Sequence, residues 1–414
     1  MSSVAIRTVG CRLNQAESAH IASSFRNAGY DVKSFDDSCD VYIVHSCTIT
    51  KNADRKSVQY ARSIKKKHPD SFVVMAGCAV EAAESGGLKD AHIDLFVSQN
   101  DKYNIPSLIP NSSVIIHNSS LVSTPSFSTT RALIKIQDGC NFCCSYCIVP
   151  QARGKPSSRP KDEIINEIRE LADNGYREFV LTGANLGCYT GVEGGLVKLL
   201  EDIQQIELVG RIRLSSIEMS TVERDIIDLI ADSEKICSYL HLPLQSGDDD
   251  ILKAMGRRYI TSDFANTIEY AASKIDLPGL GTDIITGFPG ETEQHHRNTI
   301  KLIKSLPLNN LHVFPYSERP GTAAAELQGS VDVATRKSRC EELIEIGNEK
   351  RNAFASSYIG KPVSVLVEKI DSDQIAHGWT SEYLEAELSG NEFKSNDIVV
   401  AIPSSADAGK LYLA

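Results

Sequence analysis

Residues 136–160, IQDGCNFCCSYCIVPQARGKPSSRP, place four cysteines within eight positions and follow them with basic residues. Cys140, Cys144 and Cys147, the loop triad, form a Cys-x3-Cys-x2-Cys motif directly after a predicted strand. Zinc ribbons usually have two Cys-x2-Cys pairs or a histidine partner, and no second pair lies near this motif. Three thiolates on one loop suit a [4Fe-4S] cluster whose fourth iron remains open to an external ligand. The motif therefore indicates a reactive iron–sulfur site, in which the fourth thiol, Cys143, has no assigned role.

The composition is that of a globular protein without a membrane segment. Of the 414 residues, 42% are hydrophobic and 23% are charged, and the formal net charge is −11. The first residues contain neither a basic region nor an apolar leader, and no apolar run approaches the roughly 18 residues that span a bilayer. We therefore expect two or three domains and a cytoplasmic location. In that reducing compartment the 11 cysteines are expected to bind metal or perform redox chemistry instead of forming disulfides.

The first 105 residues alternate short apolar runs with helix-like segments. VAIRTVG, DVYIVHS, FVVMAG and IDLFVS have the composition of strands, and 14–29 and 51–68 have the length and polarity of helices. This alternation predicts an open parallel α/β domain. Cys11, Cys47 and Cys78, the strand-end triad, each follow one of these strands, and the carboxyl ends of parallel strands share one sheet edge. One such cysteine is most often a buried core residue, but three at equivalent ends favour a shared metal site.

A Ser/Thr-rich stretch after residue 110 has the composition of a linker, and a second alternation of strands and helices begins at residue 132. Its six candidate strands are too few for a closed eight-stranded barrel and predict a partial (β/α)6 barrel. The last residues alternate short β-like runs with turns and predict a small β-barrel. The expected boundaries are 1–110 for the α/β domain, 111–131 for the linker, 132–330 for the partial barrel, 331–359 for a connecting helix and 360–414 for the small C-terminal β-barrel.

The cysteine loop is one of several motifs that follow one another along nearly the whole chain. They read GCRLNQAES, SCTITKNADRKS, AGCAVE, DGCNFCCSYCIVPQARG, LTGANLGCY, RLSSIEMS, HLPLQSGDDDILKAMGRRY, TDIITGFPGET and FPYSERPGT. In this order they resemble the radical S-adenosylmethionine (SAM) methylthiotransferases, whose partial barrel is a radical SAM barrel and whose C-terminal β-barrel is a TRAM domain. GCRLNQ and TITKNADRKS are most similar to the MtaB type, which acts on N6-threonylcarbamoyladenosine beside the tRNA anticodon.

The resemblance implies two [4Fe-4S] clusters and SAM as cofactors. The loop triad would hold the cluster that binds SAM and cleaves it to methionine and a 5′-deoxyadenosyl radical. The strand-end triad would hold an auxiliary cluster that carries the sulfur to be inserted, and a second SAM would supply the methyl group. The expected reaction is methylthiolation of C2 of N6-threonylcarbamoyladenosine at position 37 of tRNA.

Several residues within these motifs are expected to contact SAM. Gly183 and Asn185 follow a strand end, where a glycine turn and an amide can meet the amino acid part of SAM. Glu218 is suited to accept hydrogen bonds from ribose hydroxyls, as acidic residues do in other nucleotide sites. Asp283 is expected to be buried and paired, without a catalytic role. The full expected set of SAM-binding residues is Tyr146, Gly183, Asn185, Ser216, Glu218, Gln245, Arg258, Gly287 and Phe288.

Two basic runs lie just after cysteine ligands and are expected to flank a path for the tRNA anticodon stem-loop, whose unstacked bases are open to chemistry. The expected RNA contacts are Lys51, Arg55, Lys56, Lys65, Lys66, Lys67, Arg153, Lys155 and Arg159. The TRAM-like segment is acidic, which weakens phosphate binding there, and Trp379 is expected to pack in the core more often than to stack on a base. An electron donor protein is the other expected partner, and the protein is expected to be a monomer.

Two alternatives remain open from the sequence. The same cofactors could serve a methylthiotransferase that acts on isopentenyladenosine in tRNA or on a ribosomal protein. A protein of another class, a non-catalytic iron–sulfur sensor or RNA-binding module, would have no need of an open iron. The sulfur source, the reductant and the role of Cys143 are not determined by the sequence.

Overall fold

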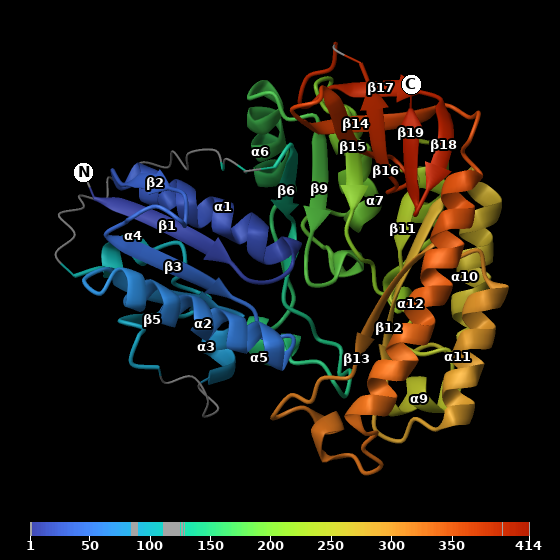
Figure 1. The fold of residues 1–414 in the computed structure, drawn as a ribbon, viewed down its shortest axis with the longest axis horizontal. Helices are drawn as coiled ribbons and strands as arrows, with labels where there is room; N and C mark the ends of the chain where they lie inside the picture. Colours follow the sequence, from blue (N-terminus) through green and yellow to red (C-terminus); the bar gives the residue numbers. More distant parts are fainter. Residues whose placement is uncertain are drawn as a thin grey trace.

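The computed structural model describes residues 2–83, 90–110, 125, 127, 129–390 and 392–413 (Figure 1). An amino-terminal lobe, a central barrel and a C-terminal sheet follow one another along the chain. Most of the expected linker at 111–131 lies outside the described residues. No described helix is long and apolar enough to cross a membrane.

The amino-terminal lobe is a parallel sheet with helices on both faces. Its elements are β1 (Ser3–Thr8), α1 (Arg12–Asn27), β2 (Asp31–Lys33), β3 (Val41–Ser46), α2 (Lys51–Lys67), β4 (Phe72–Gly77), α3 (Cys78–Ala83), β5 (Leu95–Val97) and α4 (Ile105–Leu108). The strand order is β2-β1-β3-β4-β5, and all pairings are parallel. Because side chains alternate along a strand, Ile43 packs with Phe25 of α1, whereas Val44 packs with Ile64 of α2. The predicted open parallel α/β domain is confirmed.

The central barrel has six parallel strands and an outer layer of helices. Its strands are β6 (Arg131–Lys135), β9 (Glu178–Thr182), β10 (Arg211–Leu214), β11 (Tyr239–His241), β12 (Gly279–Thr286) and β13 (Asn310–Pro315). Its helices are α6 (Lys161–Asp173), α7 (Gly195–Gln204), α8 (Arg224–Asp232), α9 (Asp249–Ala254), α10 (Thr261–Lys274) and α11 (Glu293–Ser305). The strands form two sheets, β10-β9-β6 and β11-β12-β13, linked by a parallel bridge from Ile212 to Ile236. The predicted partial barrel is confirmed.

Short elements fill the connections of the barrel. They are β7 (Gln137–Asp138), α5 (Val149–Arg153), β8 (Ser157–Ser158) and the single-turn helices η1 (Leu186–Cys188), η2 (Met219–Thr221) and η3 (Ala323–Glu326). Apart from η3, they lie at the carboxyl ends of β6, β9 and β10, which is the end of a parallel barrel that carries functional residues.

A long helix leads from the barrel to the C-terminal sheet. The helix is α12 (Val333–Ser356), and the strands are β14 (Val363–Ile370), β15 (Ile375–Thr380), β16 (Glu385–Ser389), β17 (Ile398–Ala401), β18 (Pro403–Asp407) and β19 (Lys410–Leu413). They pair in the order β17-β14-β15-β16-β19-β18, with only β16 and β19 parallel. The predicted C-terminal β structure therefore takes the form of a curled, mixed half-barrel (Figure 1).

A hydrogen-bond network centred on Glu178 connects the C-terminal sheet to the amino-terminal end of the barrel. Its fully buried carboxylate accepts hydrogen bonds from Arg211 and from Arg213, the latter at 2.8 Å. The two guanidinium groups then donate to backbone carbonyls of the C-terminal sheet, including those of Trp379 (2.8 Å) and Thr380 (2.9 Å). Burial raises the pKa of Glu178, but Arg213 and Arg211 outweigh this effect and lower that pKa to about 2. The barrel and the sheet are thus joined through one ionised carboxylate.

The turn after β15 closes the base of the barrel. Tyr383 has a φ of +70°, and its ring lies 4.8 Å from that of Trp379 and 4.9 Å from that of Tyr239 in β11. A Cβ at Gly279 would lie 2.1 Å from the carbonyl oxygen of Glu382, so this turn packs directly against β12. Trp379 is used for packing between the sheet and the barrel, which is the role that the sequence favoured.

Glu178→Gln is expected to lower the free energy of unfolding by about 3–5 kcal/mol at pH 7, because two buried guanidinium groups lose their counter-charge. Because the pKa of Glu178 is lower in the folded protein than in the unfolded chain, its ionisation stabilises the fold at any pH above the unfolded-state pKa of about 4.3. This stabilisation is lost as the pH falls from about 4.3 toward 2. Stability of Glu178→Gln should therefore fall less steeply than that of the wild type over this acid range. Urea unfolding across pH measures both effects. Glu201→Gln, in an exposed pair with Lys198, is the control and should change stability by less than about 0.5 kcal/mol.

Candidate active site

The loop triad lies between β6 and α6, at the carboxyl end of the barrel. The N–H of Cys140 donates to the carbonyl of Gly154 (3.1 Å), and β7 pairs with β8 to fold the loop back on itself. Gly139 has a φ of +68°, and a Cβ there would lie 2.1 Å from the carbonyl oxygen of Lys155, so only glycine fits. Burial raises the pKa of Cys147 to about 12, and the nearby Cys144 and Cys140 add to the rise. The structure therefore brings the three thiols together.

The strand-end triad gathers at the carboxyl edge of the amino-terminal sheet. Cys11 precedes α1 and is exposed, Cys47 follows β3 and Cys78 begins α3, and the last two are buried. A Cβ at Gly10 would lie 2.8 Å from Cβ of Cys47, so glycine permits the strand ends to approach. Burial raises the pKa of Cys78 to about 12, and Cys47 and Cys11 add to the rise. Three thiols far apart in sequence thus meet at one site.

Both triads fit an iron–sulfur cluster better than a single ion. Among the described residues, neither triad has all its sulfur atoms within 4.8 Å of one another, whereas zinc–sulfur bonds of about 2.3 Å would require a closer set. Each triad also receives N–H donors, which stabilise thiolate ligands. Nε2 of Gln99 lies 3.3 Å from Sγ of Cys78, and the N–H of Phe142 lies 3.4 Å from Sγ of Cys140.

The carboxylate of Glu17 links the two triads. It is fully buried in α1, and it accepts from Nζ of Lys102 (2.7 Å) and of Lys135 (2.7 Å) and from both terminal nitrogens of Arg153 (3.1 and 3.2 Å). Arg153 follows the loop triad, and it also donates to Oδ1 of Asn14 (3.0 Å), which accepts from Sγ of Cys11. This Glu17 network therefore joins the loop that follows one triad to the helix that follows the other.

Arg153 does not face solvent. Its side chain is 4% exposed, and the two terminal nitrogens of its guanidinium donate to Glu17, Asp138 and Asn14. The sequence-based prediction that Arg153 contacts RNA is therefore wrong: a buried guanidinium paired with two carboxylates cannot also bind phosphate.

The Glu17 network leaves a positive excess beside the strand-end triad. In the part of the chain that the structure describes, three cations, Lys102, Lys135 and Arg153, pair with two carboxylates, Glu17 and Asp138. Burial lowers the pKa of the adjoining His45 to about 4, so this histidine is neutral at physiological pH. Arg153 acts to lower the pKa of Cys78, against the larger effect of burial. A positive excess at this position suits a cluster held by three thiolates.

Arg257 and Glu218 form a buried ion pair against the loop triad. Nη2 of Arg257 lies 2.9 Å from Oε2 of Glu218, and Nη1 lies 3.4 Å from Sγ of Cys144. Arg258, which the sequence selected, is exposed and stacks over the ring of Phe142 at 4.6 Å. Arg257 was not predicted from the sequence, because two adjacent arginines cannot be told apart without knowing how the chain turns.

The other residues expected near SAM take different positions. Tyr146 and the buried Phe288 lie with ring centroids 6.5 Å apart and form an apolar wall beside the loop triad. Gln245 has a φ of +74°, which is rare for a residue other than glycine and marks functional sites. Gly287 also has a positive φ, and a Cβ at this position would lie 2.2 Å from Cγ of Arg336. Its lack of a side chain therefore makes room for Arg336. Ser216 is exposed after β10.

Asn185 is buried, and Gly183 is half-buried against Gln137. Asn185 is 3% exposed, accepts from Oγ1 of Thr221 (3.1 Å) and donates to Sγ of Cys188 (3.2 Å). Burial raises the pKa of Cys188, and Cys140 and Glu218 add to the rise, so this thiol lies near the loop triad. A lone cysteine has no spacing signal, so the sequence did not indicate that Cys188 would lie there. Cys143 points outward and is exposed.

The remaining basic residues divide into exposed and paired groups. Lys65 pairs with Asp94 (2.7 Å), and Arg159 pairs with Glu167 (2.6 Å). Lys51 is half exposed and lies 3.3 Å from Glu318 of the barrel. The exposed side chains are those of Arg55, Lys56, Lys66, Lys67 and Lys155.

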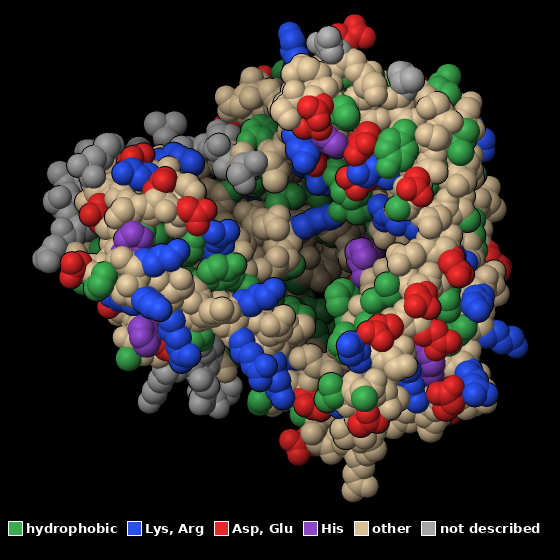
Figure 2. Space-filling view, in the orientation of Figure 1, with side chains coloured by type: hydrophobic (Ala, Val, Ile, Leu, Met, Phe, Trp, Pro, Cys, Tyr) green, Lys and Arg blue, Asp and Glu red, His purple; other side chains and the backbone are tan. Residues whose placement is uncertain are grey.

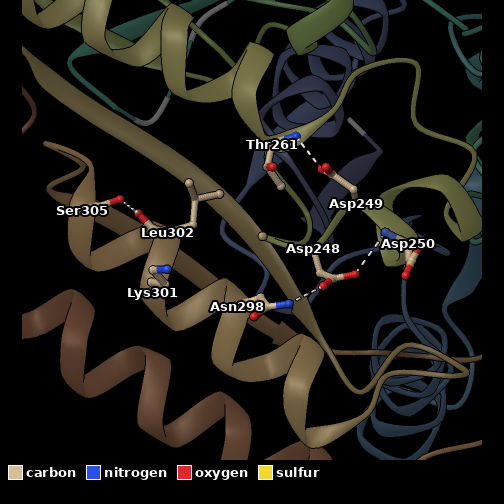
Figure 3. A pocket seen from close by; sticks show the side chains of 9 residues that line it. Asp248, Asp249, Asp250, Thr261, Asn298, Lys301, Leu302 and Ser305 are labelled. Atoms are coloured by element: carbon tan, nitrogen blue, oxygen red, sulfur yellow. Dashed lines mark hydrogen bonds between the residues drawn. The ribbon is translucent and has the colours of Figure 1, made fainter.

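A cavity of about 410 Å³ lies between α9 and α11 (Figure 3). Asp248 caps α9 through the N–H groups of Asp250 and Ile251, and its other oxygen accepts from Asn298 (2.7 Å). The other lining side chains come mainly from α11, and none of the lining residues is a cysteine.

Comparisons with known proteins agree with this geometry. The Radical SAM superfamily matches residues 134–303, and Uncharacterized protein family UPF0004 matches residues 3–98. The threonylcarbamoyladenosine tRNA methylthiotransferase MtaB of Bacillus subtilis is 34% identical and covers 96% of this chain and 93% of its own. The tRNA-2-methylthio-N(6)-dimethylallyladenosine synthase of Alkaliphilus oremlandii is 31% identical, and the match covers 94% of this chain and 87% of that protein.

A solved structure shows the same fold. The radical SAM methyltransferase TsrM from Kitasatospora setae, with cobalamin and a [4Fe-4S] cluster bound, superposes with a TM-score of 0.57 at 14% identity and covers 78% of this chain and 74% of its own. The partial barrel and its cysteine loop thus define a radical SAM enzyme, which uses SAM and a [4Fe-4S] cluster. The chain belongs to the radical SAM methylthiotransferase family.

Arg257→Lys is expected to raise the Kd for SAM by about tenfold or more, because lysine keeps the charge but cannot hold Glu218 and the loop triad at once. Arg258→Lys is the matched control and should change the Kd by less than about threefold, because its side chain is exposed. Equilibrium binding to the reconstituted enzyme measures both. Equal effects of the two substitutions would contradict the assignment of Arg257.

Proposed function

We propose that this protein methylthiolates C2 of N6-threonylcarbamoyladenosine at position 37 of tRNA. The observation that carries the proposal is the pair of cysteine triads at the barrel mouth and the adjoining sheet edge, joined through Glu17. The similarity to MtaB of Bacillus subtilis over nearly the full length supports N6-threonylcarbamoyladenosine as the substrate. The likeness to a dimethylallyladenosine-modifying enzyme is only slightly lower, so isopentenyladenosine is the alternative substrate.

The residues of the chain have separate tasks in this reaction. When bound, the cluster of the loop triad with SAM supplies a 5′-deoxyadenosyl radical, and a second cluster at the strand-end triad supplies the sulfur. Arg257 and Glu218 orient groups beside the loop triad, and Tyr146 and Phe288 exclude water from that side. Burial raises the pKa of Glu218 despite its pairing with Arg257.

Substrate delivery relies on exposed basic side chains beside the strand-end triad. Helix α2 begins just after Cys47 and presents Arg55, Lys56, Lys66 and Lys67 to solvent. Figure 2 shows Lys and Arg side chains over the amino-terminal lobe and along the rim of a hollow between the lobe and the barrel. Such a surface attracts phosphates and leaves a loop base free to enter the hollow. An electron donor protein, a monomeric state and a cytoplasmic location complete the proposal.

Mass spectrometry of tRNA nucleosides tests the proposed function. Deletion of the gene should remove 2-methylthio-N6-threonylcarbamoyladenosine and leave the unmethylthiolated nucleoside in its place. Wild-type protein should restore the product, whereas Cys78→Ser should not, because one ligand of the strand-end triad is lost. A deletion strain that keeps this nucleoside, or that loses 2-methylthio-N6-isopentenyladenosine instead, would contradict the proposed substrate.

A further inference from the structure

The barrel-facing side of β13 carries side chains that the radical SAM site does not use. Asn310, His312 and Phe314 alternate along the strand and so share one side of it. Asn310 donates to the hydroxyl of Tyr239 (3.0 Å), which places this side toward the base of the barrel interior. His312 and Phe314 are 45% and 50% exposed. The open barrel thus presents an imidazole and an aromatic ring side by side.

His312 belongs to a group of three polar side chains inside the barrel. Oδ1 of Asp283 lies 3.3 Å from Nδ1 of His312 and 3.0 Å from Nε2 of His241. Burial raises the pKa of Asp283, but the two histidines outweigh this effect and lower that pKa. The hydroxyl of Tyr239 lies 3.1 Å from Nδ1 of His241. These contacts fix the orientation of both imidazoles around an ionised carboxylate.

A positive charge from the amino-terminal lobe reaches the same part of the barrel. Arg12 directly follows Cys11 of the strand-end triad, and its Nη2 donates to the hydroxyl of Tyr383. The ring of Tyr383 lies against that of Tyr239, which in turn contacts His241. The proposed sulfur site and the polar group in the barrel are therefore connected by one series of side-chain contacts.

We propose that Arg12, His241, Asp283, His312 and Phe314, the β13 pocket, bind the target adenine and its N6 substituent and select a substituent that carries a carboxylate. This inference rests on the proposed function and identifies the residues that choose between its two candidate nucleosides. Phe314 stacks on the base, and Arg12 donates hydrogen bonds to the carboxylate of the threonyl group. His312 donates to the same carboxylate from Nε2 in its doubly protonated form, in which Nδ1 donates to Asp283.

The spacing and polarity of these side chains favour this substituent. His312 and Phe314 are two residues apart on β13, which separates them by about 7 Å along the strand and allows one nucleoside to contact both. In the described part of the chain, Nε2 of His312 has no hydrogen-bond partner and is available to a ligand. An isopentenyl group would displace water from Asp283 and His312 and could not replace the hydrogen bonds that these side chains make to water. Polar groups left unpaired in this way strongly disfavour binding of a substrate.

Binding of two anticodon stem-loops to the reconstituted enzyme tests the proposal. The RNAs carry N6-threonylcarbamoyladenosine or N6-isopentenyladenosine at position 37, and the measured quantity is the ratio of their Kd values. The wild type should prefer the first RNA by about 100-fold, and His312→Leu should reduce that preference by about tenfold or more. Asp283→Asn, which keeps the side-chain shape, should also reduce it. Because both RNAs are measured on one sample, the ratio does not depend on how much of a variant folds.

His377→Leu is the matched control, because His377 is also a strand histidine paired with an aspartate, Asp371 (2.9 Å), but lies in the C-terminal sheet. It should leave the ratio unchanged. A wild-type preference for threonylcarbamoyladenosine that survives both His312→Leu and Asp283→Asn would overturn the pocket alone. A wild-type preference for isopentenyladenosine would overturn the proposed function as well. A stoichiometric divalent ion beyond the cluster iron, lost in His312→Leu, would also overturn the pocket, because the same three side chains would then be metal ligands.

Discussion

The buried carboxylate of Glu17 is the contact on which the relative position of the two cysteine triads depends. An unpaired carboxylate without solvent would be strongly unfavourable, and this one remains ionised because Arg153, Lys135 and Lys102 surround it. Burial raises the pKa of Glu17, but these three cations outweigh it and hold that pKa well below its usual range. The cations come from the amino-terminal lobe and from the barrel. Glu17 is therefore paired with all three cations only when the amino-terminal lobe is docked against the barrel.

A second buried carboxylate performs the same task at the base of the barrel. Glu178 forms ion pairs with Arg211 and Arg213, and these two arginines donate hydrogen bonds to backbone carbonyls of the C-terminal sheet. The barrel interior is thus bounded by the C-terminal turn at its base and by the cysteine loop at its mouth. The amino-terminal lobe lies at its side, with Arg12 reaching into it. A six-stranded barrel leaves one side open, and this architecture places the proposed sulfur site beside that opening.

The sequence predicted the elements well where local chemistry determines them. Strands such as Val41–Ser46 are buried on both faces, so most of their residues are apolar, in contrast with the polar flanking helices. The loop triad is visible because its three ligands are within eight residues, and the strand-end triad because each cysteine directly follows a strand.

The sequence did not predict features that depend on partners far along the chain. Arg153 looks like a solvated basic residue until its partner Glu17, 136 positions away, is known. Arg257 and Arg258 are equivalent in the sequence, and only the turn after α9 directs one toward Cys144. The β13 pocket was missed for the same reason: His241, Asp283 and His312 come from three separate strands, and none of them forms a motif with the others.

The yield of methylthiolated nucleoside per SAM cleaved, measured in Glu17→Gln, tests most directly the claim that the Glu17 network holds the two triads in register. Glutamine keeps the shape of the side chain and removes the charge that binds Arg153. Cleavage of SAM to 5′-deoxyadenosine should continue, because the loop triad is intact, whereas the yield per cleavage should fall by about tenfold or more as the two sites lose their alignment. A folded Glu17→Gln enzyme with the wild-type yield per cleavage would contradict the claim.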